Sequence, residues 1–134
     1  MVKSESAPHA IHFAAPPEFG GVEARWTPES LLLGAIASCF TTTFRALAEH
    51  SRFEYADLEV EVAATIEKVK SGYAFSEFRI RPKLSIASDK EQERGMHLLH
   101  KAKLLCLVSR AISAPQIFEP KVQAAHDLAR LSQN

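Results

Sequence analysis

Fifteen consecutive residues, 30–44, carry no charged side chain, and this run constrains the fold more than any other feature of the chain. It follows Thr-Pro-Glu at 27–29, which supplies a hydroxyl N-cap, a proline at the first helical position and an acid in the first turn. From Leu32 to Leu47, apolar side chains recur every three or four residues, which is helical spacing. We therefore expect a helix over residues 27–49, roughly 33 Å long.

A helix that is uncharged on every side for four turns is expected to be buried on every side. A chain of 134 residues struggles to cover such a helix alone, so we expect a second copy to cover it in a homodimer. The uncharged run, with its three threonines, is too short and too polar to predict a membrane span. Residues 2–8 lack the apolar core of a secretory signal, so we expect a cytoplasmic protein without membrane association.

Two runs in the middle of the chain, 58–67 and 78–86, alternate apolar and polar side chains with the period of a strand. Lys-Ser-Gly at 70–72 lies between them and suits a three-residue hairpin loop. This loop predicts a register that pairs Glu61 with Arg81, Glu59 with Lys83, and Val62 with Ile80. Pro82 predicts that the second strand lies at an edge, or that the proline nitrogen faces away from the ladder.

A second helix is expected after the hairpin, because Ser-Asp-Lys-Glu at 88–91 is typical of a capping box. This helix carries Cys106 and continues or restarts as far as Ile112, before Pro115 stops it. A last short strand is expected over 117–122, and its proline restricts it to an edge of the sheet.

Together with a short first strand over 9–15, these elements follow the order β-α-β-β-α-β, which predicts the α+β class in a single domain, 1–134. Sixteen acidic and sixteen basic side chains give a formal net charge of zero. Nucleic acid and anionic membranes both need a basic excess on one face, so the composition favours neither as a partner.

The two cysteines, Cys39 and Cys106, are the candidates for chemistry. In a reducing compartment they are free thiols or a working redox pair rather than a structural disulfide. Both lie in apolar segments, and small core residues are the competing interpretation. A reactive cysteine requires a neighbour that favours the thiolate.

Glu29 alone cannot supply that stabilisation, because a carboxylate disfavours a nearby thiolate; it helps only by orienting a cation. Arg25 and Arg110 are the candidate cations, although both are equally consistent with solvated surface residues.

Two other groups of side chains have ordinary alternatives. His97, His100 and Cys106 make a thin case for a metal site against solvated helix histidines. Phenylalanines either line an apolar pocket or pack in the core; they are Phe13, Phe19, Phe40 and Phe44.

Two motifs in order give the chain a resemblance to a known family. The first comprises WTPESLLLGA at 26–35 and ASCF at 37–40, preceded by PPEFGG at 16–21; the second is CLVSRA at 106–111. Together they resemble the OsmC/Ohr family of thiol peroxidases, over residues 13–122. The family's glutamate ten residues before its first cysteine corresponds here to Glu29.

The resemblance implies an α+β fold, with an antiparallel sheet, two long central helices, and two intertwined subunits whose active sites lie at the dimer interface. It also implies reduction of organic hydroperoxides in a stress response. Cys39 would be the peroxidatic residue, Cys106 would resolve it, and Glu29 would belong to the catalytic set. An external thiol or a lipoyl-bearing protein would be the reductant, and no metal, flavin or haem cofactor would be needed.

The chain departs from the family pattern at two places. Leu107 stands where many relatives have proline, and residues 1–24 contain no arginine to match the activating arginine of relatives. An alternative function is therefore an OsmC-fold protein without peroxidase activity, which binds a small apolar or thiol-containing ligand at the dimer interface. A third interpretation is a structural dimer with two inert core cysteines.

Overall fold

The structure is a computed structural model that describes residues 1–124. The chain divides into two compact units, Met1–Ala35 and Ile36–Asn134, of which the second is described as far as residue 124.

In the first unit, β1 (Val2–Ser4) and β2 (Ala7–Ile11) form an antiparallel hairpin. The strand expected over 9–15 therefore begins and ends earlier, and Phe13 makes only an isolated bridge to Trp26.

A tight loop follows, built around η1 (Pro17–Phe19). A β-carbon on Gly21 would lie 1.5 Å from the backbone oxygen of Ala15, so no larger residue fits this backbone approach.

The helix α1 (Pro28–His50) begins where the sequence predicts, and Thr27 caps it. The Thr27 hydroxyl accepts a 3.0 Å hydrogen bond from the Ser30 N–H, and the Ser30 hydroxyl accepts a 2.8 Å bond from the Thr27 N–H. This reciprocal pair has the geometry of a capping box, with serine in the place usually taken by glutamate.

In the second unit, α1 buries one stripe at four-residue spacing: Ile36, Phe40, Phe44 and Ala48. Ser38, Thr42 and Arg45 are exposed, so the described chain does not bury the helix on every side as expected. By length and composition α1 is also apolar enough to cross a bilayer, which the expectation from its uncharged run missed. Core helices of soluble proteins pass the same test, and the stripe packs in the core of this unit.

The sheet of the second unit is mixed rather than antiparallel. Its long strands β3 (Asp57–Val69) and β4 (Gly72–Ile86) pair antiparallel, and the short strands β5 (Gln116–Phe118) and β6 (Lys121–Ala124) pair parallel to β4 on its other side. The chain leaves β4 and returns through a helical connection, which brings it back in the same direction.

The predicted register is confirmed, because Glu61 lies opposite Arg81, Glu59 opposite Lys83 and Val62 opposite Ile80. The predicted three-residue loop is wrong: Val69 pairs with Gly72, which leaves a two-residue turn. Thr65 pairs with Glu77 and Ile66 with Phe75, so Ser76 is an extra residue without a pairing partner. This bulge shifts the pairing by one residue, which is why the shorter turn still gives the predicted register beyond it.

Of the two positions that Pro82 predicted, the edge is excluded, because β4 has neighbours on both sides. The proline lies where β5 has ended and β6 has not begun, so the parallel ladder is interrupted there. Pro120 lies in the same interruption, on the edge formed by β5 and β6, as expected.

After β4, Ser88 caps the single turn η2 (Asp89–Glu91), and α2 (Gln92–Leu105) follows. The helix does not continue through Cys106, whose φ of −62° and ψ of 108° are extended. A short helix, α3 (Leu107–Arg110), then restarts the helical path.

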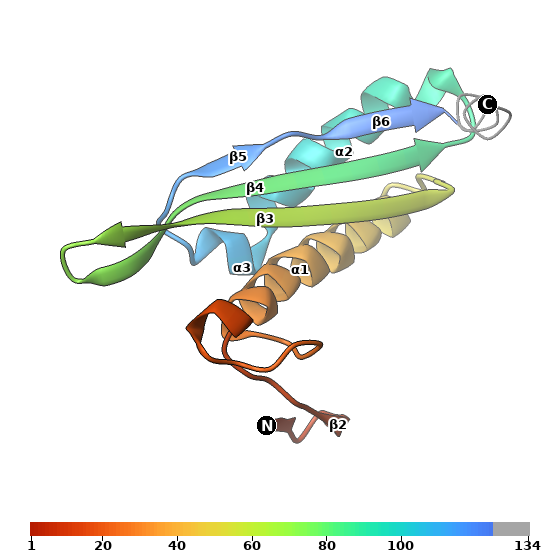
Figure 1. The fold of residues 1–134 in the computed structure, drawn as a ribbon. Coiled ribbons are helices and arrows are strands. Elements are labelled where there is room, and N and C mark those ends of the chain that lie inside the picture. Colours follow the sequence, from red (N-terminus) through yellow and green to blue (C-terminus); the bar gives the residue numbers. More distant parts are fainter. Residues whose placement is uncertain (125–134) are drawn as a thin grey trace, which may run out of the picture. The chain divides into compact units, whose positions relative to one another are not determined.

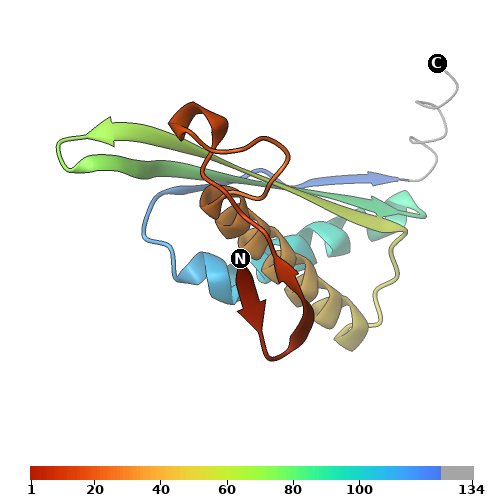
Figure 2. The ribbon, with the colours of Figure 1, turned by 60° about the horizontal axis from the view of Figure 1, so that its bottom comes forward.

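The core of the second unit lies between the sheet and its helices, which Figures 1 and 2 show on one face of the sheet. Its buried members are Phe40, Phe44, Ala48, Phe53, Leu84, Ile86, Leu98, Leu99, Ala102 and Cys106.

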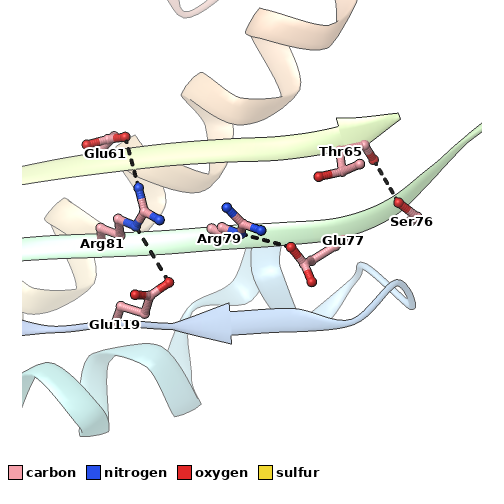
Figure 3. A network of polar contacts seen from close by, with 7 residues as sticks. All are labelled: Glu61, Thr65, Ser76, Glu77, Arg79, Arg81 and Glu119. Atoms are coloured by element: carbon pink, nitrogen blue, oxygen red, sulfur yellow. Dashed lines mark hydrogen bonds and ion pairs between the residues drawn. The ribbon is translucent and has the colours of Figure 1, made fainter. Parts of the chain in front are cut away.

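The opposite face of the sheet is charged. Figure 3 shows Arg81 paired with Glu61 and with Glu119, each at 3.6 Å. A groove of about 540 Å³ lies over this face, and neither cysteine is among its lining residues. Exposed ion pairs of this kind contribute little to stability, so the face is best described as a solvated surface.

Candidate thiol site

The structure brings the two predicted cysteines together in the second unit. Cys39 lies midway along α1 and is partly buried, and it packs against the core cluster that contains Cys106. Cys106 lies at the junction of α2 and α3 and is 1% exposed. No disulfide joins them.

The local conformation at Cys106 explains how backbone donors reach Cys39. The Cys106 carbonyl accepts bonds from the Arg110 N–H (3.1 Å) and the Ser109 hydroxyl (3.3 Å), which closes the first turn of α3. Leu107 and Val108 are the first two residues of that turn, so their N–H groups have no partner within α3. Both residues make backbone hydrogen bonds to Cys39.

Burial is the largest single influence on the pKa of the Cys39 thiol and raises it. Four hydrogen bonds together outweigh burial and hold this pKa below its ordinary value. The groups that lower the pKa are, in decreasing order, the Val108 N–H, the Cys106 thiol, the Thr43 hydroxyl and the Leu107 N–H. All four are uncharged, so hydrogen bonds to the sulfur, and not the cation that the sequence predicted, favour the thiolate.

The other predicted participants lie elsewhere or lack partners. Arg110 and Arg25 are exposed, and neither is among the groups that lower the pKa of Cys39. Glu29 lies at the start of α1 in the first unit, and its Oε2 atom is buried without a hydrogen-bond partner among residues 1–124.

The sequence interpretation missed Thr43 and the two N–H donors of α3. Thr43 was within reach of sequence reasoning, because it follows Cys39 by four residues on a predicted helix. The N–H donors depend on the break at Cys106, which the sequence left as one of two possibilities.

The remaining candidates have structural roles or stay separate. Phe40 and Phe44 are fully buried core residues, whereas Phe13 and Phe19 are exposed. His100 packs edge-on against Phe118, with 5.2 Å between ring centroids. In the described part of the chain, no group of three or more histidine, cysteine or acidic side chains is arranged to hold a metal ion.

The fold and this site define an α+β protein with a pair of adjacent free thiols. The family model described as "OsmC-like protein" matches residues 20–121, and the chain belongs to that family. The OsmC/Ohr family includes organic hydroperoxide resistance proteins.

Comparison with individual proteins agrees with the family. The uncharacterized protein YmaD of Bacillus subtilis is 30% identical over 111 residues, which cover 81% of this chain and 74% of YmaD. An organic hydroperoxide resistance protein OsmC from Legionella pneumophila superposes with a TM-score of 0.69 at 21% identity, covering 89% of this chain and 85% of that one.

The organic hydroperoxide resistance protein OhrB of Bacillus subtilis superposes with a TM-score of 0.63 at 19% identity, covering 89% and 86%. At these identities, the likeness to the solved structures shows the fold.

Proposed function

We propose that this protein is a thiol-dependent peroxidase that reduces organic hydroperoxides through Cys39 and Cys106. The observation that supports the proposal is the hydrogen bonding around the Cys39 sulfur, which includes the Cys106 thiol and favours the thiolate. A thiolate is the nucleophile in this chemistry, and an adjacent thiol is what resolution requires.

The proposed cycle has three steps. The Cys39 thiolate attacks the terminal oxygen of the hydroperoxide, the O–O bond breaks, and the alkoxide leaves and takes a proton from water. The resulting sulfenic acid condenses with the Cys106 thiol to form a disulfide and water. An external dithiol or a lipoyl-bearing protein then reduces the disulfide and is itself oxidised to a disulfide. In this proposal the protein works in the cytoplasm, in a stress response.

A homodimer is part of the same proposal. Leu104 and Leu107 are 73% and 74% exposed beside Cys106, which favours a surface that a second copy covers. The unpartnered Glu29 oxygen favours a donor from outside residues 1–124, and we propose that the second copy supplies it. Light scattering at micromolar concentration tests the dimer, and a monomer would refute it.

The activity is tested by following the loss of cumene hydroperoxide with a dithiol reductant, in the unaltered protein and in Cys39→Ser and Cys106→Ser. We expect Cys39→Ser to abolish consumption. Without the reductant, we expect Cys106→Ser to consume about one equivalent and to remain a sulfenic acid, because it has no thiol with which to form the Cys39–Cys106 disulfide. If Cys39→Ser consumes peroxide as fast as the unaltered protein, the proposal is wrong.

The same proteins test the binding alternative. Under that alternative, neither thiol reacts with peroxide near neutral pH, but a small apolar ligand protects Cys39 from alkylation. The exposed leucines beside Cys106 are the observation that would favour such a ligand. Two thiols that resist both peroxide and alkylation would favour the structural interpretation.

A further inference from the structure

Three consecutive threonines on α1 turn their hydroxyls back onto the helix. Thr41 donates to the Ala37 carbonyl at 2.8 Å, Thr42 to the Ser38 carbonyl at 3.0 Å, and Thr43 to the Cys39 carbonyl at 2.7 Å. Of these three, Thr43 is the one whose hydroxyl also hydrogen-bonds the Cys39 side chain. A helical side chain leans toward the preceding turn, which brings the Thr43 hydroxyl to the sulfur.

The Cys39 carbonyl has more donors than it needs. Besides the Thr43 hydroxyl, the Thr42 hydroxyl lies 3.1 Å from the same oxygen. The backbone N–H of Thr43 is the ordinary helical partner of this carbonyl, which has two lone pairs. If the Thr43 hydroxyl proton turns away from it, the Cys39 carbonyl therefore remains hydrogen-bonded.

We propose that Thr43 is a positioning residue for Cys39, whose hydroxyl proton turns from the Cys39 carbonyl to the sulfur when that sulfur is a thiolate. While Cys39 is a thiol, its S–H donates to the Thr43 oxygen and the Thr43 proton stays on the carbonyl. When the thiol ionises, rotation about one C–O bond supplies the sulfur with a donor, and no heavy atom moves. The thiolate thus gains a hydrogen bond without an added charge.

This inference rests on the proposed function only in so far as that function uses Cys39 as a thiolate. The groups that act on the sulfur come from both α1 and the α2–α3 junction, and Cys106 is the titratable one among them. Since Cys106 is unchanged in a Thr43 variant, a displaced Cys39 titration reports the loss of the hydroxyl.

The test measures the rate at which iodoacetamide alkylates Cys39 as a function of pH, with the modified peptide identified by mass spectrometry. In Thr43→Val, which keeps the shape and removes the hydroxyl, we expect the pH midpoint to rise. The thiolate fraction below the midpoint should fall roughly twofold to tenfold, the effect of one lost hydrogen bond. Thr43→Ser, which restores a hydroxyl, should recover most of the unaltered profile.

Thr41→Val is the matched control, because it removes a hydroxyl of similar burial that donates to the carbonyl four residues earlier. We expect its profile to follow that of the unaltered protein. The inference fails if Thr43→Val also follows the unaltered profile, or if Thr41→Val moves as far as Thr43→Val. Circular dichroism checks folding, and Thr43→Ala serves if the valine variant does not fold.

Failure of the proposed function is distinguishable from failure of this inference. If the unaltered protein leaves cumene hydroperoxide intact while Thr43→Val still displaces the Cys39 profile, the peroxidase proposal fails and the role of Thr43 stands. If the unaltered protein consumes peroxide and Thr43→Val changes neither profile nor rate, the peroxidase proposal stands and the role of Thr43 is refuted.

Discussion

Replacing Leu107 by proline should remove one hydrogen bond from the Cys39 sulfur and change little else. Leu107 is the first residue of α3, where proline is well tolerated because its missing N–H has no helical partner. Proline also restricts the residue before it to extended conformations, and Cys106 already has φ −62° and ψ 108°. Within one chain the leucine side chain is 74% exposed, and Leu107→Ala removes the same contacts with a second copy, so comparison with that variant isolates the N–H.

The magnitude follows from the lost hydrogen bond. A typical net contribution of about 0.5–1.5 kcal/mol corresponds to a roughly twofold to tenfold change in an equilibrium constant. The Leu107 N–H is the last of the four groups that lower the pKa of Cys39, so we expect the lower part of that range. Relative to Leu107→Ala, stability should be unchanged or raised by about 0.4–1 kcal/mol, because proline restricts the unfolded chain.

The assay combines the pH profile of Cys39 alkylation with urea unfolding, and Leu107→Ala is the matched control that keeps the N–H. We expect Leu107→Pro to raise the pH midpoint of Cys39 while Leu107→Ala leaves it unchanged. Identical midpoints in both variants would refute the assignment of this N–H. If Leu107→Pro is less stable than Leu107→Ala by more than about 1 kcal/mol, the backbone at position 107 does not accommodate proline.

Three further predictions follow from particular groups. Because hydrogen bonds hold the pKa of Cys39 below the ordinary thiol value, the unfolded chain binds more protons between these two values. Relative to Cys39→Ser, the free energy of unfolding should therefore rise with pH through that window and stay level on either side of it, as measured by urea titration. Gly21→Ala should destabilise the chain by more than about 1 kcal/mol, because the added carbon meets the Ala15 backbone. Gly34→Ala should stabilise it by about 0.5–1 kcal/mol, because the added carbon makes only ordinary contacts within a helix; thermal unfolding measures both effects. Since the four groups that favour the Cys39 thiolate are uncharged, added salt should move its pH midpoint little, and a clear upward movement would indicate a cation instead.

The pairing of the two long strands could be predicted from the sequence, because one pattern of side chains extends along both. Alternation and opposite charges set the β3–β4 register, because a slip by one residue would place Val62 and Ile80 on the wet face. The turn was less predictable, since a two-residue turn with a bulge at Ser76 and a three-residue loop give the same pairing of Glu61 with Arg81. Pro82 left two positions open, because a proline is tolerated both at an edge and where a ladder is interrupted, and the interruption here depends on β5 and β6.

The site was predictable in its side chains and not in its backbone. Cys39 and Cys106 were evident as the chemical candidates, and the structure packs Cys39 against the cluster that contains Cys106, while their chemical role stays a prediction. The donors on Leu107 and Val108 depend on the extended backbone at Cys106, and a run of apolar residues does not decide between a continuous helix and one that restarts. The sequence therefore predicted arginines as the groups that stabilise the thiolate, although backbone N–H groups stabilise a thiolate as well.

The surroundings of Cys39 and of Glu29 differ in the source of their hydrogen-bond donors. The Cys39 sulfur has four uncharged groups of the same chain around it, among them the Leu107 N–H that a proline at position 107 would remove. None of these four groups is a cation that Glu29 could orient. The buried Oε2 atom of Glu29 has no hydrogen-bond partner among the described residues, and under our proposal the second copy of the dimer supplies its donor. The Cys39 sulfur, by contrast, accepts hydrogen bonds from groups of its own chain.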